Sequence, residues 1–351
     1  MTTDFWQGRR VLVTGHTGFK GGWLSLWLHR MGAHVTGLAL PAPTEPSFFA
    51  QTRLADLVEH HVGDVRDMQV VMDAIAAARP EIVFHLAAQP LVRYSYDNPV
   101  ETYATNVMGT VHVLEACRAV DSVRAVVCVT SDKCYENREW IWPYRESDPM
   151  GGHDPYSSSK GAAEIAIASW RHSYPDGPAI ASVRAGNVIG GGDWAQDRLV
   201  PDIVRALIAD VPVSVRNPAS IRPWQHVLEA LSGYLMVGER LLEGRRDAAT
   251  AWNFGPSEED AQPVGWIVDQ MLASWGSATG WDRPNVAGPH EAVLLRLDSS
   301  KARSELGWKP KLRLNEALTI IVDWHKGVAQ SGDARDISLR QIDQFAGHGA
   351  A

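Results

Sequence analysis

Short apolar runs alternate with segments of helical periodicity along the first 185 residues of the chain, and this alternation limits the possible folds most strongly. In an α/β protein such a pattern gives parallel strands connected by helices that pack on both faces of the sheet. We therefore predict an α/β fold with a doubly wound parallel sheet, whose ligand binds beyond the carboxyl ends of the strands. The predicted strands are residues 11–13, 34–40, 82–84, 125–129 and 180–183, and helical patterns include 22–31, 100–120 and 156–172.

The pattern becomes less regular after residue 186, where proline, glycine and tryptophan interrupt the helical segments. We predict a first domain of residues 1–186, to which residues 225–256 return. Residues 187–224 and 257–337 would form a smaller, mainly helical C-terminal substrate domain. Residues 338–351 are expected to form a weakly ordered tail.

Composition excludes several classes of protein. Apolar residues make up 45% of the chain and charged residues 21%, which excludes a disordered or collagen-like chain. No window of about 20 uninterrupted apolar residues exists, so we expect no membrane partner. The N-terminal residues also lack the apolar core of a secretory signal.

Charge and cysteine usage narrow the partners further. The net charge of −8 argues against nucleic acid but is compatible with arginines clustered around a small anionic substrate. The three cysteines, Cys117, Cys128 and Cys134, include no Cys-x-x-Cys pair. We therefore expect no metal, no disulfide framework and a reduced, cytoplasmic protein.

A glycine-rich turn over residues 15–21 directly follows the first predicted strand and opens a helix. Glycines there let backbone N–H groups approach a pyrophosphate at the positive end of the helix dipole. Taken alone, the turn is also compatible with an ordinary strand-to-helix connection. Its place after the first strand favours dinucleotide binding. The candidate cofactor-binding residues in this turn are Gly15, Thr17, Gly18, Phe19 and Lys20.

The second predicted strand, residues 34–40, distinguishes between the two nicotinamide cofactors. It ends without an acidic residue to hold the adenosine ribose, and without an arginine to bind a 2′-phosphate. We therefore predict NAD as the cofactor, with a weaker hold on its adenosine ribose than is usual.

A second constellation joins Tyr156 and Lys160, which are four residues apart and share one face of a helix. The ammonium group beside the phenol is expected to lower its pKa from about 10, so that Tyr156 serves as a base in hydride transfer. Ser131, after the predicted strand of residues 125–129, would donate a hydrogen bond to the reacting oxygen. Asp132 and Lys133 follow directly, either as a solvated ion pair or as an acid–base pair at the ligand edge of the sheet.

These motifs resemble the extended short-chain dehydrogenase/reductase family, and in particular its nucleotide-sugar dehydratase branch. Related dehydratases carry Thr-Asp-Glu where this chain has Ser131-Asp132-Lys133. With lysine in place of glutamate, the chain resembles the CDP-glucose 4,6-dehydratase subfamily. Segments 15–21, 130–140, 183–194, 221–227 and 252–256 carry the same similarity, which extends to about residue 308.

The resemblance implies a Rossmann-like domain that binds NAD, a smaller domain that binds a nucleotide sugar, and dehydration of CDP-glucose to CDP-4-keto-6-deoxyglucose. It implies that Ser131, Tyr156 and Lys160 support oxidation at C4, and that Asp132 and Lys133 act as acid and base in water loss. It also implies a homodimer or homotetramer. The further cofactor contacts that it implies are Asp64, Val65, Leu86, Ala87, Ala88, Gln89 and Asn106, together with Tyr156 and Lys160. The implied substrate contacts are Gln89, Arg93, Asn187, Arg198, Arg222, Trp224 and His290.

Two alternatives stay open at this point. A dehydratase or epimerase for another nucleotide sugar would have the same fold, although Asp132 argues against an epimerase and Lys133 against the glutamate-bearing TDP and GDP enzymes. A non-catalytic NAD-binding sensor would be expected to lack Tyr156 or Lys160, and both are present. Lys133 as a base requires a lowered pKa, for which burial or a nearby cation would serve.

Overall fold

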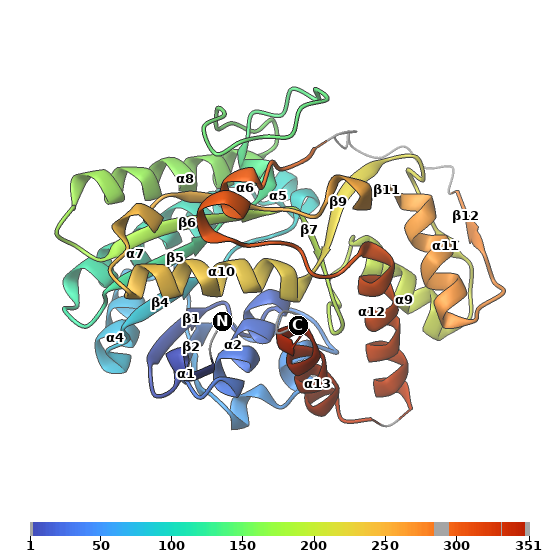
Figure 1. Ribbon diagram of the computed structural model, residues 1–351, viewed down its shortest axis with the longest axis horizontal. Coiled ribbons are helices and arrows are strands. Elements are labelled where there is room, and N and C mark those ends of the chain that lie inside the picture. Colours follow the sequence, from blue (N-terminus) through green and yellow to red (C-terminus); the bar gives the residue numbers. More distant parts are fainter. Residues whose placement is uncertain (1–2, 284–294, 331, 348–351) are drawn as a thin grey trace.

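The computed structural model describes residues 3–283, 295–330 and 332–347. Its centre is a parallel sheet of seven strands in the order β10-β6-β5-β4-β1-β2-β3, with helices on both faces (Figure 1). This sheet confirms the predicted Rossmann-like, doubly wound α/β fold. Its strands are β1 (Arg10–Thr14), β2 (His34–Ala39), β3 (Glu59–Val62), β4 (Ile82–His85), β5 (Ala125–Val129), β6 (Ala179–Ala185) and β10 (Ala251–Phe254).

Alternation of side chains along the central strands explains why both faces of the sheet are covered. In β5, Val127 belongs to the core formed with α2 (Phe19–Arg30) and α10 (Val227–Leu242). Its neighbours Val126 and Cys128 belong to the core on the opposite face. The helices on that opposite face are α4 (Met68–Ala78), α7 (Gly109–Ala119) and α8 (Pro155–Ser173). The first half of the chain also contains four short helices, α1 (Thr3–Trp6), α3 (Phe48–Gln51), α5 (Val92–Asp97) and α6 (Pro99–Tyr103).

Much of the chain after β6, though not α10 or β10, builds a second group of elements, at the right of Figure 1. Their apolar core includes Ile203, Trp224 and Ile321, while β10 pairs with β6 in the main sheet. One small sheet contains three strands, β7 (Asn187–Ile189), β9 (Ile221–His226) and β11 (Ala261–Pro263). A second small sheet contains two strands, β8 (Val213–Ser214) and β12 (Trp281–Asp282). The helices are α9 (Leu199–Ala209), α11 (Val264–Trp275) and α12 (Leu314–Ala329).

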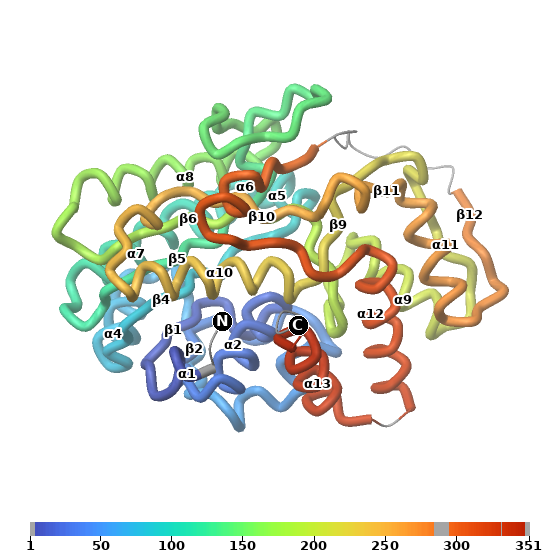
Figure 2. Tube along the Cα trace, in the orientation of Figure 1, coloured from blue at the N-terminus to red at the C-terminus, as the bar shows by residue number. Residues whose placement is uncertain are grey.

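The C-terminal residues differ from the expected weakly ordered tail. Residues 338–347 form most of α13 (Ala334–Gly347), which packs against α2 near the N-terminal end of the chain (Figure 2). Phe345 meets the ring of Trp27 edge-on, with the ring centroids 5.7 Å apart, and the Trp324 indole donates a hydrogen bond to the Ser338 hydroxyl at 2.9 Å. The expectation was wrong for these residues because their apolar side chains recur at helical spacing and become buried.

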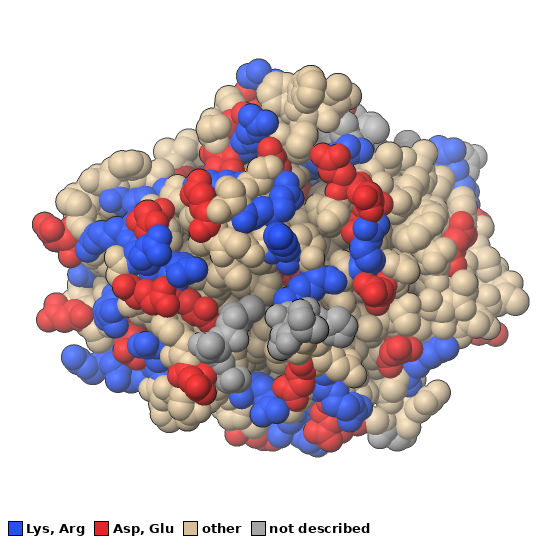
Figure 3. All heavy atoms as spheres, viewed as in Figure 1, with Lys and Arg blue, Asp and Glu red and all other residues tan. Residues whose placement is uncertain are grey.

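Charged side chains of both signs are interspersed over the face shown in Figure 3. Within the described ranges, no helix is long and apolar enough to cross a membrane. Nor do those residues contain a group of three or more His, Cys, Asp and Glu side chains able to hold a metal ion. Cys117, Cys128 and Cys134 are buried free thiols.

Candidate active site

The glycine-rich turn between β1 and α2 lies against the chain that leaves β4, and its shape requires residues without side chains. Gly15 has a φ of +76°, and a Cβ there would lie 2.7 Å from the Ala87 nitrogen. A Cβ at Gly21 would lie 2.1 Å from the Gly15 carbonyl oxygen. The Thr14 hydroxyl accepts hydrogen bonds from the N–H groups of Leu86 and Ala87, both at 3.1 Å. The turn therefore brings β1, β4 and the start of α2 together at the carboxyl edge of the sheet.

This junction fits the diphosphate of NAD. The first N–H groups of α2 have no acceptor inside the helix, and the positive end of the helix dipole lies at the same place. Lys20 lies in the first turn of α2. Burial, together with repulsion from Lys160 and Arg198, lowers the pKa of its ammonium group to about 7. An added anion would stabilise the charged form of Lys20.

A pair of histidines lies between β2 and β3, near the end of the strand that lacks an acid. His16 Nε2 is 2.7 Å from Nδ1 of His60, and the ring of Phe49 packs against both. A Cβ at Gly37 would lie 2.3 Å from the His16 ring, so this glycine makes room for it. Burial, followed by repulsion from His60, lowers the pKa of His16 to about 4. Sequence reasoning missed this pair because its members are far apart along the chain.

Several expected cofactor contacts are already engaged with protein groups. The Asp64 carboxylate pairs with Arg66 at 2.6 Å, and Val65 is buried. Asn106 accepts a hydrogen bond from the Gln89 N–H at 2.9 Å and donates one to the Gln89 carbonyl oxygen at 3.1 Å. The amide side chain of Gln89 is hydrogen-bonded within the protein as well. The hydrogen bonds between Asn106 and Gln89 therefore fix the shape of the loop after β4, which contains Leu86, Ala87 and Ala88.

The groups expected to act on the sugar meet beyond the end of β5. The Ser131 hydroxyl donates a hydrogen bond to Asp132 Oδ1 at 3.0 Å and accepts one from the Lys133 N–H at 3.2 Å. The side chain of Ser131 also acts on Tyr156, in the first turn of α8, where it lowers the pKa of the phenol. Asp154 caps α8 and so fixes where the helix begins. Acid, hydroxyl and phenol are thereby connected through one serine.

Burial dominates the protonation of these groups. It raises the pKa of the Asp132 carboxyl, which favours an acid that keeps its proton to higher pH. It lowers the pKa of the Lys160 ammonium to about 8, although the charge of Glu164 acts in the opposite direction. It also raises the pKa of Tyr156 to about 12, against the effects of Ser131 and Arg198. The expected lowering of the Tyr156 pKa was therefore wrong for this arrangement, because burial outweighs the nearby charges.

The three arginines among the expected substrate contacts come from different elements. Arg198 immediately precedes α9 and pairs with the buried Asp193 at 3.1 Å. Arg93, on α5, pairs at 3.3 Å with the residue before Arg198. Arg222, on β9, lies close enough to Asp132 to lower the pKa of that carboxyl. The structure thus brings positive charge to Asp132 and Tyr156 from β9 and from the start of α9.

The remaining expected substrate contacts are less directly placed. Asn187 and Trp224 lie opposite each other in the pairing of β7 with β9. The Trp224 ring belongs to the second apolar core, and its indole nitrogen is buried with no hydrogen-bond partner among the described residues. His290 lies outside the described residues.

Two residues that sequence reasoning missed lie directly behind the site. Glu164, one turn after Lys160 on α8, forms an ion pair at 2.7 Å with Arg184 of β6, and each side chain is 4% exposed. The available signals were a glutamate on the buried face of the helix and an arginine within an otherwise apolar strand.

The chain is similar to known proteins along most of its length. The NAD dependent epimerase/dehydratase family matches residues 11–255. The chain belongs to this family. Within it, a CDP-glucose 4,6-dehydratase from Salmonella typhimurium is 56% identical over 349 residues, which are 97% of this chain and 97% of that protein. A dTDP-glucose 4,6-dehydratase from Xanthomonas campestris is 26% identical and covers 90% of this chain and 92% of its own.

Solved structures of the epimerase/dehydratase family have the same fold. A dTDP-glucose 4,6-dehydratase from Streptomyces venezuelae with NAD bound has a TM-score of 0.77 at 22% identity, over 92% of this chain and 99% of its own. A UDP-glucose 4-epimerase from Thermotoga maritima has a TM-score of 0.78 at 20% identity, over 91% of this chain and 99% of its own. The comparisons confirm the resemblance to nucleotide-sugar dehydratases of this family.

Proposed function

We propose that this protein is an NAD-dependent lyase that dehydrates CDP-glucose to CDP-4-keto-6-deoxyglucose. The observation that carries the proposal is the Asp132–Lys133 pair beside Ser131 and Tyr156, because it adds an acid and an amine to a site built for oxidation at C4. The high identity to a CDP-glucose 4,6-dehydratase along nearly the whole chain supports the choice of reaction and of nucleotide.

The residues that would hold NAD are those at the glycine-rich turn and the loop after β4. The N–H groups at the start of α2 would bind its diphosphate, and Lys20 would add a positive charge beside it. The chemistry that NAD supplies when bound is acceptance of hydride from C4 of the sugar and its later return to C6. Lys160, on the helix face that carries Tyr156, would place a positive charge close to the phenol and to NAD.

In the oxidation step, Tyr156 takes the proton of the sugar 4-hydroxyl. Ser131 lies beside the phenol and favours its deprotonated form. Positive charge from Arg198 favours the phenolate that this step requires. General base help of this kind is typically worth about 10²–10⁴-fold in rate.

In the elimination step, the 4-ketone makes the C5 proton acidic. Lys133 removes that proton, and Asp132 gives its own proton to the departing 6-hydroxyl, which leaves as water. The raised pKa of the Asp132 carboxyl suits a group that must hold a proton near neutrality. Return of hydride to C6 and of a proton from Lys133 to C5 completes the 4-keto-6-deoxy product. The proton that Tyr156 took from the 4-hydroxyl replaces the one that Asp132 gave to the leaving water, so both groups return to their starting forms.

Substrate choice is tested by incubating the protein with CDP-, TDP-, UDP- and GDP-glucose and following each product by mass spectrometry. We expect a mass loss of one water from CDP-glucose with NAD, and little or none from the other sugars. Conversion to an isomer without mass loss would instead favour a 4-epimerase. Preferred conversion of a different nucleotide sugar would contradict the choice of CDP-glucose.

We expect NAD to be held only moderately, because β2 ends without a carboxylate for the adenosine ribose. Dialysed protein should therefore regain activity when NAD is added, and less when NADP is added. The measurement pairs activity with the amount of NAD released on denaturation. Full activity with NAD retained through dialysis would contradict this expectation.

A homodimer or homotetramer is also part of the proposal, supported by apolar side chains on adjoining helices. Tyr103 of α6, 38% exposed, donates a hydrogen bond to Ser158 of α8 at 2.8 Å. Ile165 lies on the same face of α8 and is 62% exposed. We expect light scattering to give an oligomer for the parent and a smaller species for Ile165→Arg, with exposed Val211→Arg as the control. A monomeric parent would contradict the assembly.

The buried free thiols support a cytoplasmic location.

A further inference from the structure

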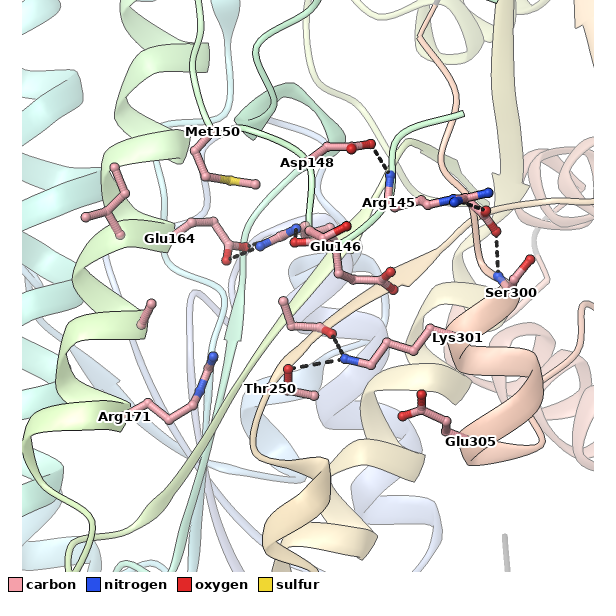
Figure 4. Close-up of a pocket in the computed structure, with 16 residues that line it drawn as sticks. Arg145, Glu146, Asp148, Met150, Glu164, Arg171, Thr250, Ser300, Lys301 and Glu305 are labelled. Atoms are coloured by element: carbon pink, nitrogen blue, oxygen red, sulfur yellow. Dashed lines mark hydrogen bonds and ion pairs between the residues drawn. The ribbon is translucent and has the colours of Figure 1, made fainter. Parts of the chain in front are cut away.

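The buried carboxylate of Glu164 collects hydrogen bonds from two strands of the main sheet. Arg184 donates to it from Nε at 2.9 Å and from Nη2 at 2.7 Å. Ser182 donates at 2.8 Å, and the hydroxyl of Thr130 donates as well. Figure 4 shows Glu164 on its helix facing the guanidinium group to which it is bonded. A carboxylate with this many donors is held firmly in one position.

These partners connect the two elements that carry the catalytic groups. Thr130 immediately precedes Ser131 at the end of β5, and Glu164 lies one turn after Lys160 and two turns after Tyr156 on α8. The Glu164–Thr130 hydrogen bond therefore joins the strand end with the serine to the helix with the tyrosine. A small change at this bond would alter the distance between the Ser131 and Tyr156 hydroxyls.

The network continues to the segment that follows the acid–base pair. Arg184 Nη1 donates to the Tyr135 hydroxyl at 2.6 Å, which in turn donates to Asn253 Oδ1 of β10 at 2.8 Å. Tyr135 is two residues after Lys133 and is almost fully buried. The ion pair thus also anchors the chain just beyond Lys133.

A cavity of about 730 Å³ is lined by Glu164 and Arg184 but not by Ser131 or Tyr156 (Figure 4). Both side chains line the cavity, yet each is only 4% exposed, so the pair forms part of the wall behind the active site. Loss of the pair would weaken this wall as well as the bond to Thr130.

The charge of Glu164 acts on Lys160 as well. Among the groups that influence Lys160, Glu164 and the thiols of Cys128 and Cys134 favour the ammonium form. His85 of β4 and Lys20 of α2 also face it. At neutral pH the thiols and His85 are uncharged, because burial raises the thiol pKa values and lowers that of His85 to about 3. Of the groups named here that favour the ammonium form of Lys160, Glu164 is therefore the one that is charged at neutral pH.

We propose that Glu164 is a positioning residue of this enzyme, which sets the placement of Ser131 through Thr130 and holds Lys160 as an ammonium group. The inference rests on the proposed dehydratase function, because it assigns a role within that reaction. Its two parts are separable: Thr130→Val removes the bond but keeps the charge, whereas Glu164→Gln removes the charge and keeps a hydrogen-bond acceptor.

The two variants are expected to differ in their pH profiles. Thr130→Val should lower kcat by about 10- to 100-fold through misplacement, with the pH profile unchanged. Glu164→Gln should move the alkaline limb of kcat/KM to lower pH by about one unit or more, because Lys160 then loses its proton more easily. Glu229→Gln, at a buried glutamate of α10 that accepts from the N–H groups of Lys311 and Leu312, is the matched control and should leave the profile in place.

Direct titration of Lys160 gives a measurement that needs no turnover. In protein labelled with ¹³C-lysine, the signal missing from Lys160→Arg identifies this side chain, and its pKa should fall in Glu164→Gln. If Glu164→Gln does not fold because Arg184 is left unpaired, the Glu164→Gln/Arg184→Met double variant removes both charges and should show the same fall. An unchanged Lys160 pKa in a folded variant would overturn the proposal. If the unsubstituted protein is inactive on every nucleotide sugar, the proposed function is refuted. The Lys160 titration would still test the effect of Glu164 on Lys160.

Discussion

Replacement of Tyr156 by phenylalanine is expected to lower kcat by about 10³–10⁴-fold, while the fold and NAD binding stay intact. Tyr156 lies in the first turn of α8, close to Ser131 and to the buried Asp132. The phenol of Tyr234 also lies near Asp132 and Tyr156, but it is buried with no hydrogen-bond partner among the described residues. The loss of one hydroxyl removes the base without leaving a large cavity.

The measurement compares turnover, thermal unfolding and NAD affinity in parent and variant. Tyr103→Phe is a suitable control, since Tyr103 also contacts α8 through Ser158 but lies on the surface, away from Ser131. We expect that control to retain most of its turnover. A folded Tyr156→Phe protein with near-parental kcat would exclude Tyr156 as the base, and a different group would have to remove the 4-hydroxyl proton.

Local patterns in the sequence were sufficient to predict the sheet and the segments that meet at its carboxyl edge. Strand alternation and the glycine spacing each depend on residues close together in the chain, and the structure brings Ser131, Asp132 and Tyr156 to one place at the sheet edge. The Tyr–Lys spacing likewise follows from the helix geometry alone.

The features that were missed depend on tertiary contacts or on burial. The Glu164–Arg184 pair joins a helix to a strand, and the His16–His60 pair joins a turn to a strand 44 residues away. Neither has a local pattern. The Tyr156 pKa was misjudged for a related reason, because the loss of solvent around the phenol cannot be read from the spacing of its lysine.

Replacement of Asp132 by asparagine is expected to slow water loss by about 10²–10⁴-fold and to affect C4 oxidation much less. Asparagine keeps the size of the side chain and its hydrogen bond with Ser131, but it has no proton to give to the 6-hydroxyl. Reduced cofactor should therefore accumulate transiently after mixing with CDP-glucose, which stopped-flow absorbance measures. Equal slowing of oxidation and water loss would contradict a role confined to elimination.

The pH dependence of water loss gives a second measure of the same group. Burial raises the Asp132 pKa, so the acid form persists to higher pH than in an exposed aspartate and is lost as the pH rises through the raised value. We expect the rate of water loss in the parent to fall on that alkaline side. The fall should be absent from the slow reaction of Asp132→Asn. An unchanged alkaline limb in the variant would assign it to another group, such as Lys160.

The partner of Asp132 in this step is tested by proton exchange at C5. Lys133→Met should suppress the exchange of the C5 proton with deuterated solvent, because methionine keeps the apolar stem of the side chain but has no amine. Lys133→Glu should restore part of the exchange, since a carboxylate is also a base. Lys309→Met, at an exposed lysine, is the control for loss of one positive charge. If Lys133→Met exchanges C5 at the parental rate, Lys133 is not the base, and a water molecule or a second amine such as Lys20 must remove that proton.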